Sequence, residues 1–416
     1  MLATVISVAV PMLVFTAVVL LLATFVLVAR RGLAPTREVQ ITVNDGQQLA
    51  ATTGDKLLWA LAVQGIHLPA ACGGRGSCGQ CRVIVTAGGG EALPTEENHI
   101  SRQDVAAGTR LACMVALHDD VSVSLPASML QAREWQSRVR SNRSITTYLK
   151  ELVLELPGDL DLTFAAGDYV LLRAPVQTVR YADFDIDPQY REEWQRRGLL
   201  DLVTVIDVPT TRAYSLASHP LETRSSEGGV LKLVVRIAIP PPDAPTDVPP
   251  GKVSSWVFGL APGDSVTLSG PFGTFHVRDS DREMVLIGGG AGIAPLRAMV
   301  FEQLLVRRTQ RRLSLWYGAR NLRELCYAQE FEALAADHEN FSYHLALSDR
   351  DVEADWPGSR GYIHHILFQQ YLQHHPCPED ADYYLCGPPL MSSAVMTMLE
   401  DLGVGRDSVF YDDFGE

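Results

Sequence analysis

The sequence predicts a multidomain protein: a transmembrane helix, then a small α+β domain, an antiparallel β-barrel and a doubly wound α/β domain. Three observations support this prediction. The first 29 residues carry no charged side chain. Short strand-like segments separated by glycine and proline turns fill the region up to residue 277, and strands alternate with helices from there to the C-terminus. The predicted domains are 1–29, a linker 30–37, 38–130, 131–277 and 278–416.

Residues 1–29 are expected to form one permanent membrane anchor. As a helix at about 1.5 Å per residue, this stretch would be roughly 40 Å long, more than the ~30 Å hydrocarbon core requires. A cleaved signal peptide is the alternative, but it would begin with basic residues and have a shorter apolar region. Arg30 and Arg31 follow the stretch, so the positive-inside rule predicts that the later domains lie in the cytoplasm.

Charge and cysteine content restrict the function classes. The formal net charge is −14, which argues against a nucleic acid partner because no basic surplus is present to displace counterions from phosphates. Seven cysteines in 416 residues are too few for a disulfide scaffold. Four of them fall within residues 72–113 and three within 326–386, and this uneven clustering indicates a metal site.

The segment ACGGRGSCGQCR, residues 71–82, carries most of that cluster. Four thiolates suit either tetrahedral zinc or a [2Fe–2S] cluster. Zinc sites usually have two short Cys-x2–4-Cys spacings and this sequence has one, so zinc is the lesser alternative and a disulfide the least favoured. Glycines at 73, 74, 76 and 79 would let the backbone wrap closely around an inorganic core. The predicted ligands are Cys72, Cys78, Cys81 and Cys113.

The loop and the downstream RLAC, residues 110–113, resemble ferredoxin-type [2Fe–2S] domains. The resemblance implies a β-grasp-like α+β fold for residues 38–130. The first cysteine gap is five residues rather than the four of plant-type ferredoxins, so plant-type potentials are not carried over.

Two segments of the predicted barrel resemble the ferredoxin reductase flavoprotein family. TRAYSLAS, residues 211–218, is similar to its R-x-Y-S motif. The resemblance implies that Arg212 binds the FAD pyrophosphate, that Tyr214 lies against the isoalloxazine, and that Ser215 is a catalytic group near flavin N5. PPGKVSSWVF, residues 249–258, resembles the family's second phosphate-binding element. The FAD-binding candidates there are Gly251, Val253, Ser254 and Ser255.

Three segments of the last domain resemble the nicotinamide half of the same family. LIGGGAGIAPLR, residues 286–297, follows an apolar strand and opens a helix, which suits a pyrophosphate at the helix N-terminus. Its spacing matches the family's G-G-G-x-G-x-x-P form rather than G-x-G-x-x-G. YLCGPP, residues 384–389, is similar to the element that places a cysteine, here Cys386, beside the nicotinamide, and Cys386 is the second predicted catalytic residue. In the third segment, YDDFGE at residues 411–416, Phe414 is implied to shield the flavin face. The remaining NADH-binding candidates are Gly288, Gly289, Gly290, Gly292, Gly387 and Pro388.

The order of these modules resembles the NADH-oxidising subunits of the bacterial sodium-translocating NADH:quinone oxidoreductases over nearly the whole chain. That resemblance implies electron flow from NADH to FAD, to a [2Fe–2S] cluster, to partner subunits and finally to quinone. It also implies a single-pass protein of the bacterial inner membrane, in a complex that exports sodium. Two alternatives remain: an NADH-dependent reductase component of an oxygenase, and a non-enzymatic ferredoxin-type electron carrier.

Overall fold

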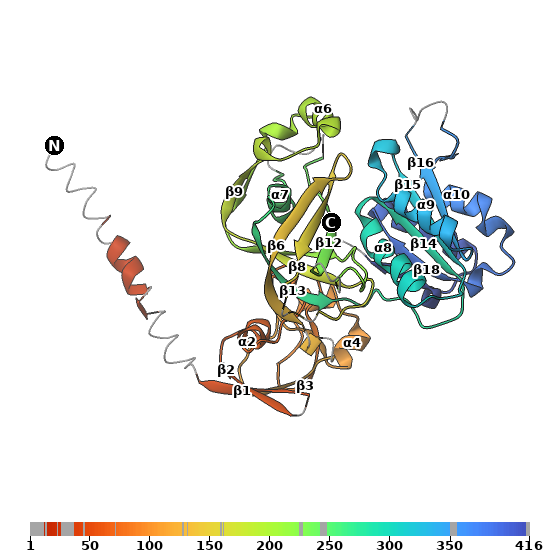
Figure 1. Cartoon of the computed structure of the whole chain (residues 1–416). Coiled ribbons are helices and arrows are strands. Elements are labelled where there is room, and N and C mark those ends of the chain that lie inside the picture. The colour runs from red at the N-terminus through yellow and green to blue at the C-terminus, as the bar shows by residue number, and fades with distance from the viewer. Residues whose placement is uncertain are drawn as a thin grey trace, which may run out of the picture. The chain divides into compact units, whose positions relative to one another are not determined.

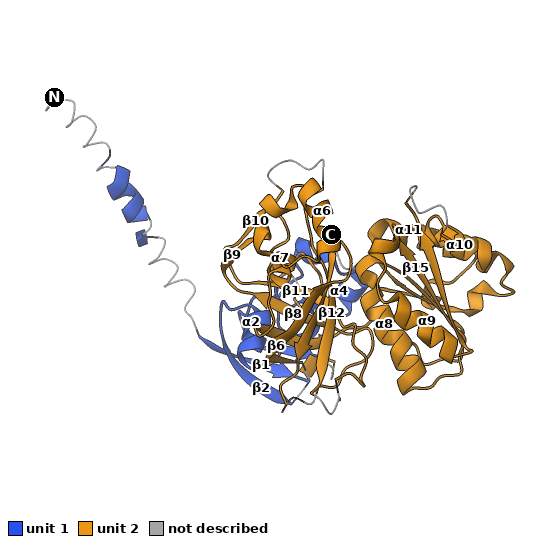
Figure 2. Ribbon diagram, turned by 45° about the horizontal axis from the view of Figure 1, so that its top comes forward, with its two compact units in different colours: residues 1–64, 81–125 blue, residues 65–80, 126–416 orange. Residues whose placement is uncertain are grey.

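The computed structural model forms two compact units, residues 1–64 with 81–125 and residues 65–80 with 126–416 (Figures 1 and 2). Most of the predicted anchor lies outside the described residues, although residues 15–22 are helical. In the part of the chain that the structure describes, none of the helices has the length and apolar character needed to cross a membrane. The structure describes residues 12, 15–22, 24–25, 37–44, 46–70, 72–126, 129–130, 132–158, 160, 162–223, 228–241, 248–349 and 356–412.

The first unit is a five-stranded mixed sheet with a short helix, as predicted for an α+β domain. The strand order is β2-β1-β5-β3-β4, in which β1 and β5 are parallel and the other neighbours antiparallel. Alternate residues of β1 are buried, the period of two expected for a half-covered strand. The elements are β1 (Glu38–Val43), β2 (Gln47–Thr52), α2 (Leu57–Val63), β3 (Arg82–Ala87), α3 (Pro94–Glu97), α4 (Arg102–Ala106), β4 (Thr109–Leu111) and β5 (Val121–Ser124).

The second unit begins with a six-stranded antiparallel sheet in the order β11-β8-β13-β6-β7-β12. A bridge between Leu216 and Leu233 joins its two outer strands, and the Ala217 N–H donates to the Lys232 carbonyl at 2.8 Å. The sheet therefore curls into the predicted barrel. Its strands are β6 (Arg133–Ser144), β7 (Leu149–Glu155), β8 (Tyr169–Ala174), β11 (Thr210–Ser215), β12 (Val230–Arg236) and β13 (Ser265–Phe272).

The charged segment 181–200 is a helical insertion in this barrel. It lies between the paired strands β9 and β10. Although the segment is polar overall, Tyr181 and Trp194 are fully buried and pack near Phe258 of α7 (Lys252–Phe258). These aromatic side chains fix the insertion to the barrel. The elements are β9 (Gln177–Arg180), η1 (Tyr181–Asp183), α6 (Pro188–Arg196), η2 (Leu199–Asp201) and β10 (Val203–Ile206).

The last part of the second unit is a parallel sheet in the order β17-β16-β15-β14-β18-β19. Side chains of α8 and α9 share one apolar cluster with the sheet, and those of α10 and α11 share another, so helices cover both faces (Figure 1). This confirms the doubly wound prediction. The strands are β14 (Met284–Gly289), β15 (Leu313–Ala319), β16 (Phe341–Leu347), β17 (Ser359–Arg360), β18 (Asp382–Cys386) and β19 (Val409–Asp412); the helices are α8 (Ile293–Phe301), α9 (Ala328–Asp337), α10 (Ile363–Gln370) and α11 (Pro389–Asp401).

The strand order indicates where a ligand would bind. From β14 the chain adds strands β15, β16 and β17 on one side, and then returns to add β18 and β19 on the other. Ligands of open α/β sheets bind at the carboxyl ends of the strands where this reversal occurs. In this sheet that point lies between Gly289, which ends β14, and Cys386, which ends β18.

Candidate functional site

The turn predicted to bind the nicotinamide nucleotide, residues 288–292 and here called the nicotinamide turn, packs directly against the end of β18. Gly288 pairs with Cys386 in the parallel ladder. A Cβ atom on Gly292 would lie 2.0 Å from the Cys386 carbonyl oxygen and 2.7 Å from the Gly387 nitrogen. Gly290 differs, because it has a φ of +55° and a Cβ there would meet nothing within 4 Å. Protein atoms therefore leave no room for a side chain at Gly292, whereas the space at Gly290 is open, as a dinucleotide site at a helix start requires.

The CGPP segment lies beside this turn, at the end of β18. Cys386 is fully buried, so its thiol acts in the fold as a small apolar group. A Cβ on Gly387 would lie 2.4 Å from Met391 Cε and 3.1 Å from the Gly289 nitrogen. Pro388 precedes the first turn of α11. The structure thus brings together the two motifs that the sequence analysis placed almost a hundred residues apart.

Strand β11 carries the three R-x-Y-S residues at one edge strand of the barrel sheet. Arg212 is exposed, and its guanidinium donates to the Thr211 carbonyl at 2.8 Å. Arg212 and Tyr214 are two residues apart, so they lie on the same face of the strand. Ser215, at the end of the strand, is only 6% exposed. An exposed guanidinium beside a tyrosine suits a phosphate-bearing aromatic cofactor such as FAD.

Ser215 has a partner that the sequence analysis did not identify. Its hydroxyl donates to Oδ2 of Asp412 at 3.1 Å, and Asp412 ends β19 of the parallel sheet. Tyr169 pairs with Ser215 across the barrel strands, and burial together with the Asp412 carboxylate raises the pKa of Tyr169. One hint was present in the sequence, the strand-like SVFYDD, but the role considered there belonged to Phe414, which lies outside the described residues.

The second predicted phosphate element is the start of α7. The Ser254 hydroxyl donates to the Gly251 carbonyl at 3.2 Å and accepts from the Ala238 N–H at 3.1 Å. The Ser255 hydroxyl lies 2.7 Å from the Tyr181 hydroxyl and is buried. Val253 is also buried. Both hydroxyls therefore have partners within the barrel, and the groups that this turn offers to a phosphate are the backbone N–H groups of its first turn.

The cysteine loop, residues 72–80, has the backbone expected around an inorganic cluster. Gly73, Gly74, Gly76 and Gly79 all have positive φ, from +65° to +79°, where L side chains are strained. The Arg75 N–H donates to Cys72 Sγ at 3.3 Å. Burial raises the pKa of the Cys72 thiol, but hydrogen bonds from the backbone of Ser77 and from Cys78 outweigh it and bring the pKa to about 6. The loop therefore favours a thiolate at Cys72, whereas burial and the neighbouring Cys72 sulfur raise the pKa of the Cys78 thiol.

Cys81 and Cys113 lie at neighbouring positions of the first unit. Arg82 pairs with Leu111 in the β3–β4 ladder, and the Ala112 N–H donates to the Cys81 carbonyl at 2.8 Å. Both thiols are buried, at 1% and 2% exposure. The loop that carries Cys72 and Cys78 is grouped with the second unit.

No disulfide joins any of the seven cysteines, all of which the structure describes, so the disulfide alternative is wrong. Among the described residues, no three His, Cys, Asp or Glu side chains are gathered closely enough to hold a metal ion. The donor chemistry nevertheless fits a [2Fe–2S] cluster, because four cysteine sulfurs and a glycine-lined loop are what such a cluster requires.

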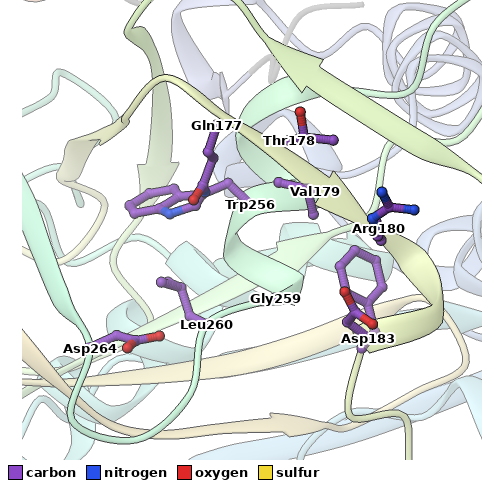
Figure 3. Close-up of a pocket in the computed structure, with 10 residues that line it drawn as sticks. Gln177, Thr178, Val179, Arg180, Asp183, Trp256, Gly259, Leu260 and Asp264 are labelled. Carbon is purple, nitrogen blue, oxygen red and sulfur yellow. The ribbon is translucent and has the colours of Figure 1, made fainter.

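A separate pocket of about 190 Å³ lies between β9 and the end of α7 (Figure 3). Trp256 of α7 and Leu260, two residues after that helix, line it together with Arg180 of β9. None of the residues predicted to bind FAD or NADH lines this pocket. It is therefore distinct from the two nucleotide sites predicted from the sequence.

Comparison with family models divides the chain into three known domains. Residues 41–118 match a 2Fe-2S iron-sulfur cluster binding domain, which includes all four predicted cysteine ligands. Residues 200–277 match an oxidoreductase FAD-binding domain. Residues 286–397 match an oxidoreductase NAD-binding domain, which includes the nicotinamide turn and CGPP.

Solved structures with a similar fold include an Amycolatopsis cytochrome P450 reductase, GcoB, with a TM-score of 0.63 and 26% identity, covering 90% of this chain and 98% of that one. The ferredoxin reductase of carbazole 1,9a-dioxygenase has a TM-score of 0.58 and 23% identity, covering 91% and 99%. The first is similar in sequence as well as in fold, whereas the second shows the fold alone.

Curated relatives are considerably more similar. The F subunit of the Na(+)-translocating NADH-quinone reductase of Pseudomonas paraeruginosa is 47% identical over 401 residues, which cover 96% of this chain and 97% of the relative. Proteins of the same name in Marinomonas sp. and Neisseria meningitidis are each 46% identical over 96% of this chain. The chain belongs to the family of F subunits of Na(+)-translocating NADH-quinone reductases.

Proposed function

We propose that this chain is the NADH-oxidising subunit of a sodium-translocating NADH:quinone oxidoreductase. It takes hydride from NADH onto FAD and delivers single electrons through a [2Fe–2S] cluster to partner subunits and finally to quinone. The observation that carries the proposal is the hydrogen bond between Ser215 and Asp412. It joins the end of β11, the strand predicted to bind flavin, to the parallel sheet whose strand ends suit a nicotinamide nucleotide.

The chain's residues would perform binding, orientation and proton control. FAD supplies the conversion of a two-electron hydride donor into a one-electron source. Arg212 would neutralise a phosphate, and the N–H groups at the start of α7 would bind another oxygen of the same pyrophosphate. Ser215 would hold a proton at Oγ beside flavin N5, with Asp412 accepting the hydroxyl hydrogen until the cofactor competes for it. Tyr214 would lie against the isoalloxazine, and Phe414 would shield the ring.

The nicotinamide side depends on close packing. Gly288, Gly289 and Gly292 keep β14 and α8 tight against β18, so that a pyrophosphate could reach the start of α8 over Gly290. Cys386 is buried at the end of β18, beside this turn, and would exclude water from the reacting ring face. Gly387 and Pro388 fix its place at the end of β18. Hydride transfer needs donor and acceptor within about 3–3.5 Å, and a dry, rigid crevice favours that approach.

Cys72, Cys78, Cys81 and Cys113 would hold the cluster. Support comes from the iron–sulfur family model over residues 41–118 and from the positive φ of the four loop glycines. We infer that residues 1–29 anchor the chain in the bacterial inner membrane by one helix, with the other domains on the cytoplasmic side. Such an anchor would keep the cluster near membrane partners and quinone. The anchor carries no ionisable side chain, so sodium transport is assigned to the partners.

The oxygenase reductase alternative is weaker on two counts. The similar cytochrome P450 reductase is 26% identical, whereas the sodium-translocating relatives are 46–47% identical. Reductases that serve a soluble oxygenase also have no use for an apolar N-terminal stretch. The electron-carrier alternative does not explain why the RAYS, GGGAG and CGPP motifs are all intact.

One experiment tests the proposal as a whole. The full-length protein, purified in detergent, is analysed for iron, zinc and flavin and then mixed anaerobically with NADH. We expect two iron atoms and one FAD per chain, bleaching of the flavin absorbance, and the EPR signal of a reduced cluster. Zinc in place of iron would contradict the cluster assignment. Flavin that stays oxidised in the presence of NADH would contradict the dehydrogenase assignment.

A further inference from the structure

We propose that Arg297 is a positioning residue that sets the separation between β11, here called the flavin strand, and the nicotinamide turn. This inference rests on the proposed function. Arg297 lies on α8, five residues after Gly292, and its side chain is only 2% exposed. A fully buried arginine requires partners on every side, because an unpaired charge in the interior is strongly destabilising. Its partners come from both the barrel and the parallel sheet domain.

On the barrel side, Arg297 contacts the segment that continues from the flavin strand. One terminal nitrogen donates to the Ala217 carbonyl at 2.7 Å, and Ala217 follows Ser215 by two residues. The same nitrogen lies 3.1 Å from Glu222 Oε2, and the other terminal nitrogen lies 3.2 Å from Glu222 Oε1. This fork-to-fork geometry fixes direction as well as distance. Figures 1 and 2 both show α8 beside β12 of the barrel.

The Glu222 carboxylate is held in the barrel by partners other than Arg297 as well. The Lys232 ammonium on β12 donates to Glu222 Oε1 at 2.6 Å, and the Glu222 carboxylate accepts from the His219 N–H at 3.1 Å. Burial raises the pKa of Glu222, but Arg297 and Lys232 outweigh it and bring the pKa to about 2. The acceptor is therefore charged and immobile at neutral pH.

Arg297 is also held by side chains of its own domain. Its Nε donates to Glu330 Oε2 on α9 at 2.8 Å. The guanidinium lies over the rings of Phe301 at 4.4 Å and Tyr327 at 5.1 Å. Tyr327 makes a second tie to the barrel, because its hydroxyl donates to Glu151 on β7 at 2.8 Å. The Arg297 side chain thus has partners both in the barrel and in its own domain. The nicotinamide turn ends about one and a half helical turns before Arg297.

This arrangement costs more than an apolar contact would. Replacing a buried ion pair by well-packed apolar groups is often neutral or stabilising, so stability alone does not account for it. A directional link between two domains that each hold one reactant does account for it, since a misplacement of about 1 Å can slow a reaction about 100-fold. Arg297 does not itself touch the reacting atoms; it acts through α8 and the Ser215 segment.

The test compares Arg297→Met with Arg311→Met in the full-length, FAD-loaded protein. Arg311 is also a buried arginine of the parallel sheet domain, paired with Asp382 at 2.9 Å at the opposite, amino end of the strands. Anaerobic stopped-flow measures the limiting rate of flavin reduction at saturating NADH, per bound FAD. We expect a fall of about 10- to 100-fold for Arg297→Met, with FAD content retained and a changed kinetic isotope effect for NADH deuterated at C4. Arg311→Met should lower Tm while leaving the limiting rate within twofold of the wild type.

Two outcomes of this test would overturn the positioning role of Arg297. Equal limiting rates in Arg297→Met and wild type, whatever the change in Tm, would overturn the positioning role and leave the dehydrogenase function intact. Equal losses of rate per FAD in both variants would also overturn it, because any buried arginine would then do the same. Arg297→Lys, which keeps the charge but loses the fork, should recover stability without recovering the rate. Wild-type flavin that NADH fails to reduce would contradict the proposed function itself.

Discussion

The cysteine loop and the nicotinamide turn are the two most glycine-rich segments with a predicted cofactor role, and their glycines are there for different reasons. In the cysteine loop, Gly73 has a φ of +68° and a Cβ on it would meet nothing within 4 Å. In the nicotinamide turn, Gly292 has an ordinary helical φ of −61°, but a Cβ would collide with the backbone of Cys386. Conformation requires the first glycine, and space requires the second.

The difference separates two kinds of binding site. A loop of positive-φ glycines turns its backbone towards whatever lies in its concave side, which suits a compact inorganic cluster held by sulfur. In the nicotinamide turn Gly290 has a positive φ, whereas space limits Gly288, Gly289 and Gly292. These three bring a strand, a helix and a neighbouring strand into contact, which suits a flat, extended nucleotide lying across them. Substitutions in the cysteine loop should therefore impair cluster binding, and substitutions in the nicotinamide turn should impair flavin reduction by NADH. The two effects should be independent and differ in size.

Removing a ligand from the cysteine cluster should have the largest effect. Cys113→Ala should abolish the EPR signal of the reduced cluster, because one iron loses a thiolate, while NADH still reduces the flavin at the wild-type rate. Cys326→Ala is the matched control, since Cys326 is an equally buried thiol without a ligand-spaced neighbour. If Cys113→Ala also lost NADH-dependent flavin reduction, the two segments would not be independent.

Filling the space at Gly292 should have the next largest effect. In Gly292→Ala the methyl group would push β14 and α8 away from the end of β18, because the atoms it meets are backbone atoms. We expect flavin reduction by NADH to fall about 100-fold and stability to fall by about 1–3 kcal/mol, with the cluster signal unchanged. Gly405→Ala is the control, since Gly405 has a negative φ and open space around it. A normal reduction rate in Gly292→Ala would contradict the space argument.

Most of the fold could be predicted because its signals are local. The apolar strand before the nicotinamide turn, the alternation in β1 and the turn residues between barrel strands each follow from a few neighbouring residues. The candidate site residues were likewise found because they lie in short contiguous motifs. The contacts that join these motifs could not be found in this way.

Three buried polar groups illustrate what the sequence conceals. Arg297 donates to a carbonyl 80 residues away, and Ser215 donates to a carboxylate 197 residues away. Glu96, in a polar four-residue helix, is fully buried and accepts from Arg110 at 2.9 Å. Polar and charged residues are mostly exposed, so each of these would be assigned to the surface from its local pattern. Only the tertiary fold supplies the partners that offset the cost of their burial.

Removing the Ser215 hydroxyl tests its assigned role near flavin N5 without disturbing the packing of the nicotinamide turn. Ser215→Ala should slow flavin reduction by about 10- to 100-fold while FAD remains bound, because a positioned hydroxyl near N5 is lost and the fold of β11 is not. Ser218→Ala is the matched control: Ser218 is a buried serine of the same segment whose hydroxyl accepts from the Lys232 N–H at 2.6 Å. An unchanged rate in Ser215→Ala, measured per bound FAD, would refute the assigned role.

The smallest effect is expected where conformation alone requires glycine. In Gly73→Ala the methyl group has room, so the cost is the strain of holding an alanine at positive φ, about 1 kcal/mol. The cluster should assemble but lose iron several-fold faster to a chelator, whereas NADH reduction of the flavin stays normal. Gly54→Ala, at a φ of +94° in an open turn of the first unit, carries similar strain away from the cysteines and should leave iron release unchanged. Because asparagine tolerates positive φ better than alanine does, Gly73→Asn should fall between alanine and wild type. A Gly73→Ala effect as large as that of Gly292→Ala would mean that space, too, is limiting in the cysteine loop.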